Sequence, residues 1–340
     1  MLHNLLTNNL LFRTGLAFLT ALVVSLAAGA WLIRFFHRKN VIEDTTQPDH
    51  AGLNAIQSQK RNVPTMGGLM ILAGIVVAML LWADLRAAQV WMGMLVLAVL
   101  GGAGFLDDYI KLKHRPSRGL TKTQKLAVQF LLGGIISYLL VRMHGREWTE
   151  VRIWFGQPCS LGWWYIGWCG LVMAATSNAV NLTDGLDGLA GGLALIAFIT
   201  LGWVGSQLVD WRLHELPMAL ICSAAAGAVL GFLWFNCHPA QIFMGDTGSL
   251  ALGGLLAYAA LEWRLEPLLL AFGAVFFIEE LTVAMQIVGF KLTRKRIFPI
   301  TPIHHHFQVN LKWPEQKIVA RAWMLGVLFA VLAMILLRVF

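Results

Sequence analysis

The segment Val90–Lys113, VWMGMLVLAVLGGAGFLDDYIKLK, decides the fold class because it joins an apolar run to two aspartates and then to lysines. The run Val90–Leu106 carries no charge, and a helix that crosses a bilayer needs about 20 mostly apolar residues. Unpaired backbone groups are costly in lipid, so this run is expected to be helical. Asp107 and Asp108 then lie where the helix leaves the hydrocarbon, and charged groups in that position indicate function.

The whole chain has the composition of a membrane protein. Of its 340 residues, 58% are hydrophobic and only 13% are charged, about half of the roughly 25% that is usual in soluble domains. This excludes a disordered, collagen-like or disulfide-framework protein. The formal net charge of +8 could indicate nucleic acid, but an excess of basic residues on cytoplasmic loops explains it more simply. We expect a lipid bilayer around the chain and no nucleic-acid partner.

Ten apolar segments along the chain are candidate membrane spans. They are Gly15–Ile33, Met66–Trp82, Val90–Leu106, Leu126–Val141, Leu161–Val180, Leu189–Val209, Leu216–Phe235, Ser249–Leu261, Pro267–Gly289 and Ala320–Val339. The fourth and eighth are short, so we expect their helices to extend further. The prediction is an all-α, polytopic membrane protein with about ten transmembrane helices, in which residues 1–340 form a single integral-membrane domain.

Basic residues predict the orientation of these spans. The first, third and ninth connections carry 5, 6 and 6 Lys or Arg, whereas the even connections and the N-terminal tail together carry 7. Because basic residues accumulate on cytoplasmic loops, the odd connections are expected to face the cytoplasm and both termini the outside. No connection is long enough to form a soluble domain of any size. The active site is therefore expected at the cytoplasmic face of the membrane.

Seven acidic residues lie at or within predicted spans, and all seven fall on this cytoplasmic side. Ionisable groups are expensive there, so each is a candidate functional residue. They are Asp107 and Asp108 after the third span, Asp184 and Asp187 in NLTDGLDGLA, Asp246 in FMGDTGSLALGG, and Glu279 and Glu280 within the ninth span.

The aspartates allow both functional and structural interpretations. Asp107 and Asp108 would repel each other unless compensated, for which Mg²⁺ is a natural candidate; a solvated helix end is the alternative. Asp184 and Asp187 are three residues apart, which on a helix puts both on one face, although either could instead cap the sixth span. Asp246 stands at a helix start, where it is either a cap or a metal ligand beside a phosphate.

A triple histidine in a basic cytoplasmic loop is the strongest single feature. His304, His305 and His306, in TPIHHHFQ, could donate hydrogen bonds to phosphate or bind metal. Three consecutive histidines cannot all point one way, so a zinc site made by all three is not expected. Nearby lysines, including Lys60, Lys111 and Lys125, could neutralise phosphate, although the positive-inside bias alone explains them as a group.

The motifs together resemble the phospho-N-acetylmuramoyl-pentapeptide transferases, within the polyprenyl-phosphate N-acetylhexosamine-1-phosphate transferases. The resemblance covers essentially the whole chain and is carried, in the family's order, by PTMGG at Pro64–Gly68, LDDY at Leu106–Tyr109, NLTDGLDGLA at Asn181–Ala190, FMGDTGSLALGG at Phe243–Gly254 and PIHHHF at Pro302–Phe307. It implies transfer of phospho-MurNAc-pentapeptide from UDP-MurNAc-pentapeptide to undecaprenyl phosphate, giving lipid I and UMP. It also implies Mg²⁺, the bacterial cytoplasmic (inner) membrane, peptidoglycan synthesis and a homodimer.

The same resemblance implies roles for individual residues. Asp107, Asp108 and Asp246 would form the catalytic centre, with Asp246 as the principal metal ligand and Asp107 and Asp108 as further candidates. Substrate would be bound by Lys60, Thr65, Lys125, Asn181, Asp184, Asp187, Asn236, Phe243, Gln286, His304, His305 and His306. Whether Asp107 activates the lipid phosphate for direct attack, or a carboxylate first forms a covalent intermediate, is open at this point.

Two other functions compete with this interpretation. A sister enzyme that transfers GlcNAc-1-phosphate from UDP-GlcNAc shares the aspartate motifs, but PTMGG and PIHHHF favour the muramoyl-pentapeptide donor. An ion-coupled transporter would place carboxylates near the middle of the bilayer on broken helices of repeated halves. Here most acids cluster at cytoplasmic span ends, and no repeat is visible.

Overall fold

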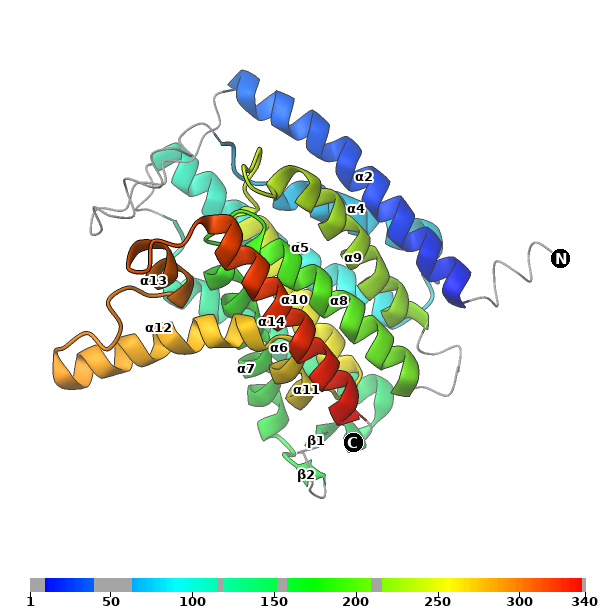
Figure 1. The fold of residues 1–340 in the computed structure, drawn as a ribbon. Helices are drawn as coiled ribbons and strands as arrows, with labels where there is room; N and C mark the ends of the chain where they lie inside the picture. The colour runs from blue at the N-terminus through cyan, green and yellow to red at the C-terminus, as the bar shows by residue number, and fades with distance from the viewer. Residues whose placement is uncertain (1–9, 40–62, 115–118, 152–157, 209–215, 338–340) are drawn as a thin grey trace.

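A computed structural model describes residues 10–39, 63–114, 119–151, 158–208 and 216–337 (Figure 1). Its elements are α2 (Leu10–Lys39), α4 (Gly68–Trp82), α5 (Ala88–His114), α6 (Lys122–His144), η2 (Arg146–Thr149), β1 (Glu150–Val151), β2 (Cys159–Ser160), α7 (Trp164–Thr183), α8 (Leu189–Leu208), α9 (Leu216–Asn236), α10 (Gly245–Glu262), α11 (Glu266–Phe272), α12 (Ala274–Thr293), α13 (Ile303–Val309) and α14 (Glu315–Leu336). The strands form one short antiparallel pair, in which Val151 faces Cys159. The predicted all-α class is confirmed.

Every predicted span overlaps at least one of these helices. Within the described residues, α2, α5, α6, α9 and α14 are long and apolar enough to cross a membrane, and the bent pair α11–α12 would make a sixth span. The fourth and eighth predicted segments do extend, to the full lengths of α6 and α10. The chain is thus a multi-pass membrane protein, whereas the count of ten spans and the placement of the termini stay predictions.

The predicted ninth span, Pro267–Gly289, is wrong as a continuous helix. It is divided into α11 and α12, whose axes meet at 90°. The two helices meet at Gly273, whose backbone angles, φ −99° and ψ 11°, lie outside the α-helical range. Figure 1 shows the consequence, because α12, drawn in orange, extends away from the other helices. Exposed apolar side chains on this arm, including Leu281, Val288 and Leu292, suit contact with lipid.

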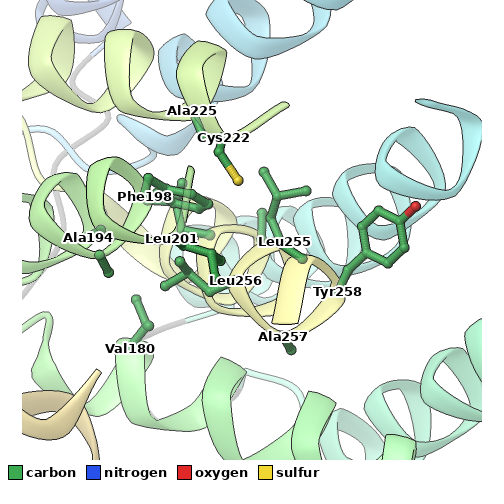
Figure 2. Packing of buried hydrophobic residues seen from close by; sticks show 14 of the residues in the cluster. Val180, Ala194, Phe198, Leu201, Cys222, Ala225, Leu255, Leu256, Ala257 and Tyr258 are labelled. Atoms are coloured by element: carbon green, nitrogen blue, oxygen red, sulfur yellow. The ribbon is translucent and has the colours of Figure 1, made fainter. Parts of the chain in front are cut away.

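Helix α10 is the centre of the bundle. All of its residues from Thr247 to Glu262 are buried, and it contacts α4, α5, α7, α8, α9 and α11. Figure 2 shows the packing around it, with Leu255 and Leu256 of α10 near Phe198 and Leu201 of α8 and Cys222 and Ala225 of α9. Tyr258 points to the other side, where its hydroxyl donates to the carbonyl of Gln89 in α5. The first turn of α10 carries Asp246, so burial of this helix also fixes one predicted catalytic residue.

Two glycines allow α4 and α5 to approach the first turn of α10. A Cβ atom on Gly68 would lie 2.8 Å from the carbonyl carbon of Thr247. A Cβ atom on Gly104 would lie 2.6 Å from the backbone nitrogen of the same residue. Both separations are far below van der Waals contact, so a larger residue at either position would push α10 away. This close packing of small residues brings the end of α5 to the beginning of α10.

Candidate functional site

Three aspartates predicted to be catalytic come together at the junction of α5 and α10. Asp107 and Asp108 lie near the C-terminal end of α5 and are 0% and 3% exposed. Asp246 lies in the first turn of α10, 138 residues further along the chain than Asp108. One ligand atom from each of the three residues lies within 4.8 Å of the others. The structure therefore forms a compact acidic centre from two motifs that are distant in sequence.

Asp108 holds the beginning of α10 in place. Its Oδ1 accepts a hydrogen bond from the backbone N–H of Asp246 at 3.0 Å, and its Oδ2 accepts from the N–H and hydroxyl of Thr247 at 3.0 and 2.6 Å. The first N–H groups of a helix lack partners within the helix, and the residue before α10, Met244, provides no side-chain cap. Asp108 supplies that cap from another helix, and the helix dipole favours its negative charge.

Two lysines neutralise the other two carboxylates. Lys111 Nζ lies 2.7 Å from Asp107 Oδ2 and 3.5 Å from Asp246 Oδ1. Lys125 Nζ lies 3.0 Å from Asp107 Oδ1 and also pairs with Asp246 Oδ2. Asp107 and Asp246 are therefore both paired with positive charge before any ligand binds.

The start of α6 positions Lys125. Thr121 and Gln124 form a capping box, in which the Thr121 hydroxyl accepts from the N–H of Gln124 and the Gln124 side chain accepts from the N–H of Thr121. Just before this cap, the N–H of Leu120 donates to Asp107 Oδ1 at 2.7 Å. The helix start is thus tied to the acidic centre. Lys111 was considered only as a possible counter-charge for phosphate and not as a partner of Asp107, although its spacing of four from Asp107 on a helix predicts this ion pair.

The PTMGG motif lies beside the same centre. Phe243 donates its N–H to the carbonyl of Pro64 at 2.8 Å, and its own carbonyl accepts from Gly67 N–H at 2.7 Å. A Cβ atom on Gly245 would lie 3.1 Å from Thr65 Oγ1, so that hydroxyl faces the start of α10. Thr65 is 1% exposed, and its hydroxyl has no hydrogen-bond partner. The structure therefore brings Thr65 and Phe243 close to Asp246, as their predicted substrate role requires.

The predicted helical arrangement of Asp184 and Asp187 is wrong. Helix α7 ends at Thr183 and α8 begins at Leu189, so both aspartates lie in the non-helical connection between them. Gly188 has φ +80°, a left-handed conformation that ends any continuous helical path. Asn181, in the last turn of α7, donates to Ser249 Oγ at 2.9 Å and so points toward α10. The NLTDGLDGLA motif is a structured turn beside the acidic centre.

Asn236 fixes this turn to the connection between α9 and α10. Its Oδ1 accepts from Gly188 N–H at 2.9 Å, and its Nδ2 donates to the carbonyl of Ile242 at 2.9 Å. Asp187 contacts the same connection, since its Oδ2 accepts from Ala240 N–H at 3.0 Å. Both residues had been predicted to bind substrate, and the structure shows them bridging two loops.

The histidine motif covers the same turn from the other side. His304 and His305 of α13 are 1% and 8% exposed, and their ring centroids are 4.2 Å apart. His304 Nδ1 lies 3.1 Å from Glu279 Oε2 of α12, and the backbone N–H of His304 donates to the same oxygen at 3.3 Å. A Cβ atom on Gly185 would lie 3.1 Å from Cε1 of His304. Glu279 therefore orients this imidazole over the NLTDGLDGLA turn, and His306 follows it on α13.

Two predicted substrate residues are not shown at this centre. Gln286 of α12 accepts hydrogen bonds from the N–H groups of Ile297 and Phe298 at 3.0 and 2.8 Å. Its side-chain oxygen therefore shapes the segment that follows α12. Lys60 lies outside the described residues.

Comparison with known proteins adds to this geometry. A family model described as glycosyl transferase family 4 matches residues 90–264. That range contains the acidic centre, both lysines and the NLTDGLDGLA turn, and it ends before the histidine motif.

Several relatives match nearly the whole chain. A protein of Caulobacter vibrioides is 40% identical over 347 residues, covering 97% of this chain and 93% of its own. Proteins of Nitratidesulfovibrio vulgaris and Gemmatimonas aurantiaca are 41% and 40% identical, covering 96% and 99% of this chain and 93% and 96% of their own. All three relatives are named phospho-N-acetylmuramoyl-pentapeptide-transferase.

Proposed function

The chain belongs to the phospho-N-acetylmuramoyl-pentapeptide-transferase family, and on that premise we propose that it moves phospho-MurNAc-pentapeptide from UDP-MurNAc-pentapeptide to undecaprenyl phosphate. In this reaction an oxygen of the lipid phosphate forms a bond to the β-phosphorus of the donor. The bond between that phosphorus and the UMP oxygen breaks. The products are lipid I and UMP, and the step belongs to peptidoglycan synthesis.

The observation that carries the proposal is the buried centre of three aspartates and two lysines. Phosphoryl transfer depends mainly on positioning and on neutralising negative charge. Lys111 and Lys125 each bridge Asp107 and Asp246, so both ammonium groups stand where two phosphate-bearing substrates could meet. Asp107 is the candidate base that would accept a proton from the lipid phosphate.

The same residues suit a magnesium ion. Mg²⁺ prefers oxygen ligands and is usually held by one or two carboxylates together with substrate phosphates. Asp107 Oδ2 is buried and has no hydrogen-bond partner beyond its ion pair with Lys111, and each oxygen of Asp246 pairs with a lysine. Asp108 uses both oxygens on α10, so Asp246 and Asp107 are the better ligands. When bound, the ion would neutralise the diphosphate of the donor.

The donor is assigned to the side of the centre enclosed by PTMGG, NLTDGLDGLA and the histidines. Phe243 is half-buried and could stack on a flat base, while Thr65 and His304 each have a buried polar atom available for hydrogen bonding. Asn181, Asp184, Asp187, Asn236 and His305 line or support the same region. Lys60, Gln286 and His306 stay in the proposed set on the family resemblance alone.

The membrane arrangement completes the proposal. We assign ten spans, both termini outside, the acidic centre at the cytoplasmic face of a bacterial inner membrane, one domain over residues 1–340, and a homodimer. An interfacial site is required chemically, because the charged head of a polyprenyl phosphate stays at the membrane surface while its chain stays in lipid.

Release of UMP tests the substrates directly. The purified protein in detergent is given undecaprenyl phosphate with either UDP-MurNAc-pentapeptide or UDP-GlcNAc, and each reaction is run with Mg²⁺ or with EDTA. We expect UMP only from the muramoyl donor and only with Mg²⁺. Release of UMP from UDP-GlcNAc would show that the protein uses the donor of the sister enzymes. Release of UMP in EDTA would show that the reaction does not need a metal ion.

A further inference from the structure

A second polar cluster, formed by Asp187, His238 and Glu315, lies outside the acidic centre. Its members come from the turn before α8, the connection after α9 and the start of α14. We propose that Glu315 and His238 are positioning residues, which fix the donor-side loops without being part of the acidic centre. The inference rests on the proposed function, since it concerns the same donor site.

Glu315 ties the C-terminal helix to the NLTDGLDGLA turn. It is the first residue of α14, is 7% exposed, and accepts the backbone N–H of Asp187 on Oε1 at 2.5 Å. About two turns further along α14, Trp323 Nε1 donates to the carbonyl of Gly188 at 3.2 Å. Both contacts hold main-chain atoms of the turn, so they determine the path of its backbone.

His238 stands between the two carboxylates of the cluster. Its Nδ1 lies 3.0 Å from Asp187 Oδ2 and 3.7 Å from Glu315 Oε2. Two carboxylates this close repel each other unless a donor or a positive charge lies between them. The imidazole supplies that group, and Ala240 N–H adds a further hydrogen bond to Asp187 Oδ2. The connection between α9 and α10 is thereby held to the turn.

The contacts continue to Phe243 but not to the lysines. Asn236 joins Gly188 to Ile242, the residue before Phe243, and Phe243 in turn bonds to Pro64. The described ion pairs of Asp107 and Asp246 involve only Lys111 and Lys125. Loss of Glu315 should therefore displace the wall of the donor site while leaving the reacting centre in place.

The test compares Glu315→Ala, Glu315→Gln and a matched control, Gln316→Ala, which changes the exposed neighbour in the same turn of α14. For Glu315→Ala we expect the donor KM to rise about 10-fold, the size expected when one hydrogen bond to a charged acceptor is lost. The acceptor KM and kcat should stay within about twofold of wild type. Glu315→Gln retains an acceptor oxygen and should recover most of the donor KM, and Gln316→Ala should match wild type.

Binding of UDP, measured by calorimetry on the same variants, separates this inference from the choice of substrate. If Glu315→Ala weakens UDP binding, the inference holds even when wild type fails to use the muramoyl donor, and only the proposed substrate is lost. If folded Glu315→Ala has an unchanged donor KM and an unchanged UDP affinity, the inference is overturned. It is also overturned if kcat falls and both KM values rise by similar factors. A third outcome would overturn it in favour of a metal site: Zn²⁺ raises the Tm of wild type but not that of Glu315→Ala. If Glu315→Ala does not fold, His238→Ala takes its place with the same expected pattern.

Discussion

Replacing Asp108 by asparagine should lower the thermal stability of the protein more than the same replacement at Asp107. Asp108 is buried and accepts three hydrogen bonds at the beginning of α10, whereas Asp107 contacts lysines and the N–H of Leu120. Asparagine has nearly the same shape but only one acceptor oxygen. Its NH₂ group would therefore face either the N–H of Asp246 or the N–H of Thr247.

The magnitude follows from these bonds. A hydrogen bond to a charged group contributes roughly 1.5–3 kcal/mol, and a buried donor left without a partner costs about 1–3 kcal/mol. One carboxylate oxygen accepts from Asp246 N–H and the other from Thr247, so asparagine can keep only one side. We expect a loss of about 3 kcal/mol, which for a protein of this size corresponds to a decrease in Tm of about 4 °C.

Thermal unfolding in detergent with EDTA provides the assay, because EDTA removes any difference in metal binding. Thr247→Val removes only the hydroxyl bond of 2.6 Å and should lower Tm by about a third as much. Asp107→Asn should leave Tm within about 2 °C of wild type, since Lys111 and Lys125 both keep their ion pairs with Asp246. Equal Tm values for Asp108→Asn and Asp107→Asn would refute the capping role of Asp108.

Two further predictions concern the acidic centre and the histidines. Asp246→Asn should reduce kcat at least about 100-fold in the presence of Mg²⁺ while the protein stays folded, as measured by UMP release and gel filtration; near-normal turnover would remove Asp246 as the metal ligand. Glu279→Ala should raise the donor KM about 10-fold, because His304 loses its orienting contact, and an unchanged KM would place that pair outside the donor site.

Much of the fold could be predicted from apolar runs, because lipid leaves a chain few alternatives to helices. Each predicted span overlaps a helix, and the two short segments proved to be parts of longer ones. The bend between α11 and α12 was not predicted, since hydropathy is continuous across Gly273. An apolar count along the chain carries no information about the angle between successive helices.

Asp107, Asp108 and Asp246 lie together in the structure, whereas their catalytic role stays a prediction, and their different partners were not predicted. Only the folded chain shows that Asp108 caps α10 while Asp107 and Asp246 share two lysines. Glu315 was not singled out, because an acid after proline at a helix start is common and its partner is 128 residues away. Such long-range hydrogen bonds between loops have no signal in a single sequence.

The most direct test of the central claim follows one phosphorus atom. The donor UDP-MurNAc-pentapeptide is labelled with ³²P at the β-phosphorus and incubated with the purified protein, undecaprenyl phosphate and Mg²⁺, and the lipid and nucleotide products are separated. Transfer of phospho-MurNAc-pentapeptide predicts that the label moves into the lipid fraction while unlabelled UMP is released, and that Asp246→Asn stops both. Label that stays with the nucleotide as UDP would show that the sugar–phosphate bond breaks instead, and would contradict the account.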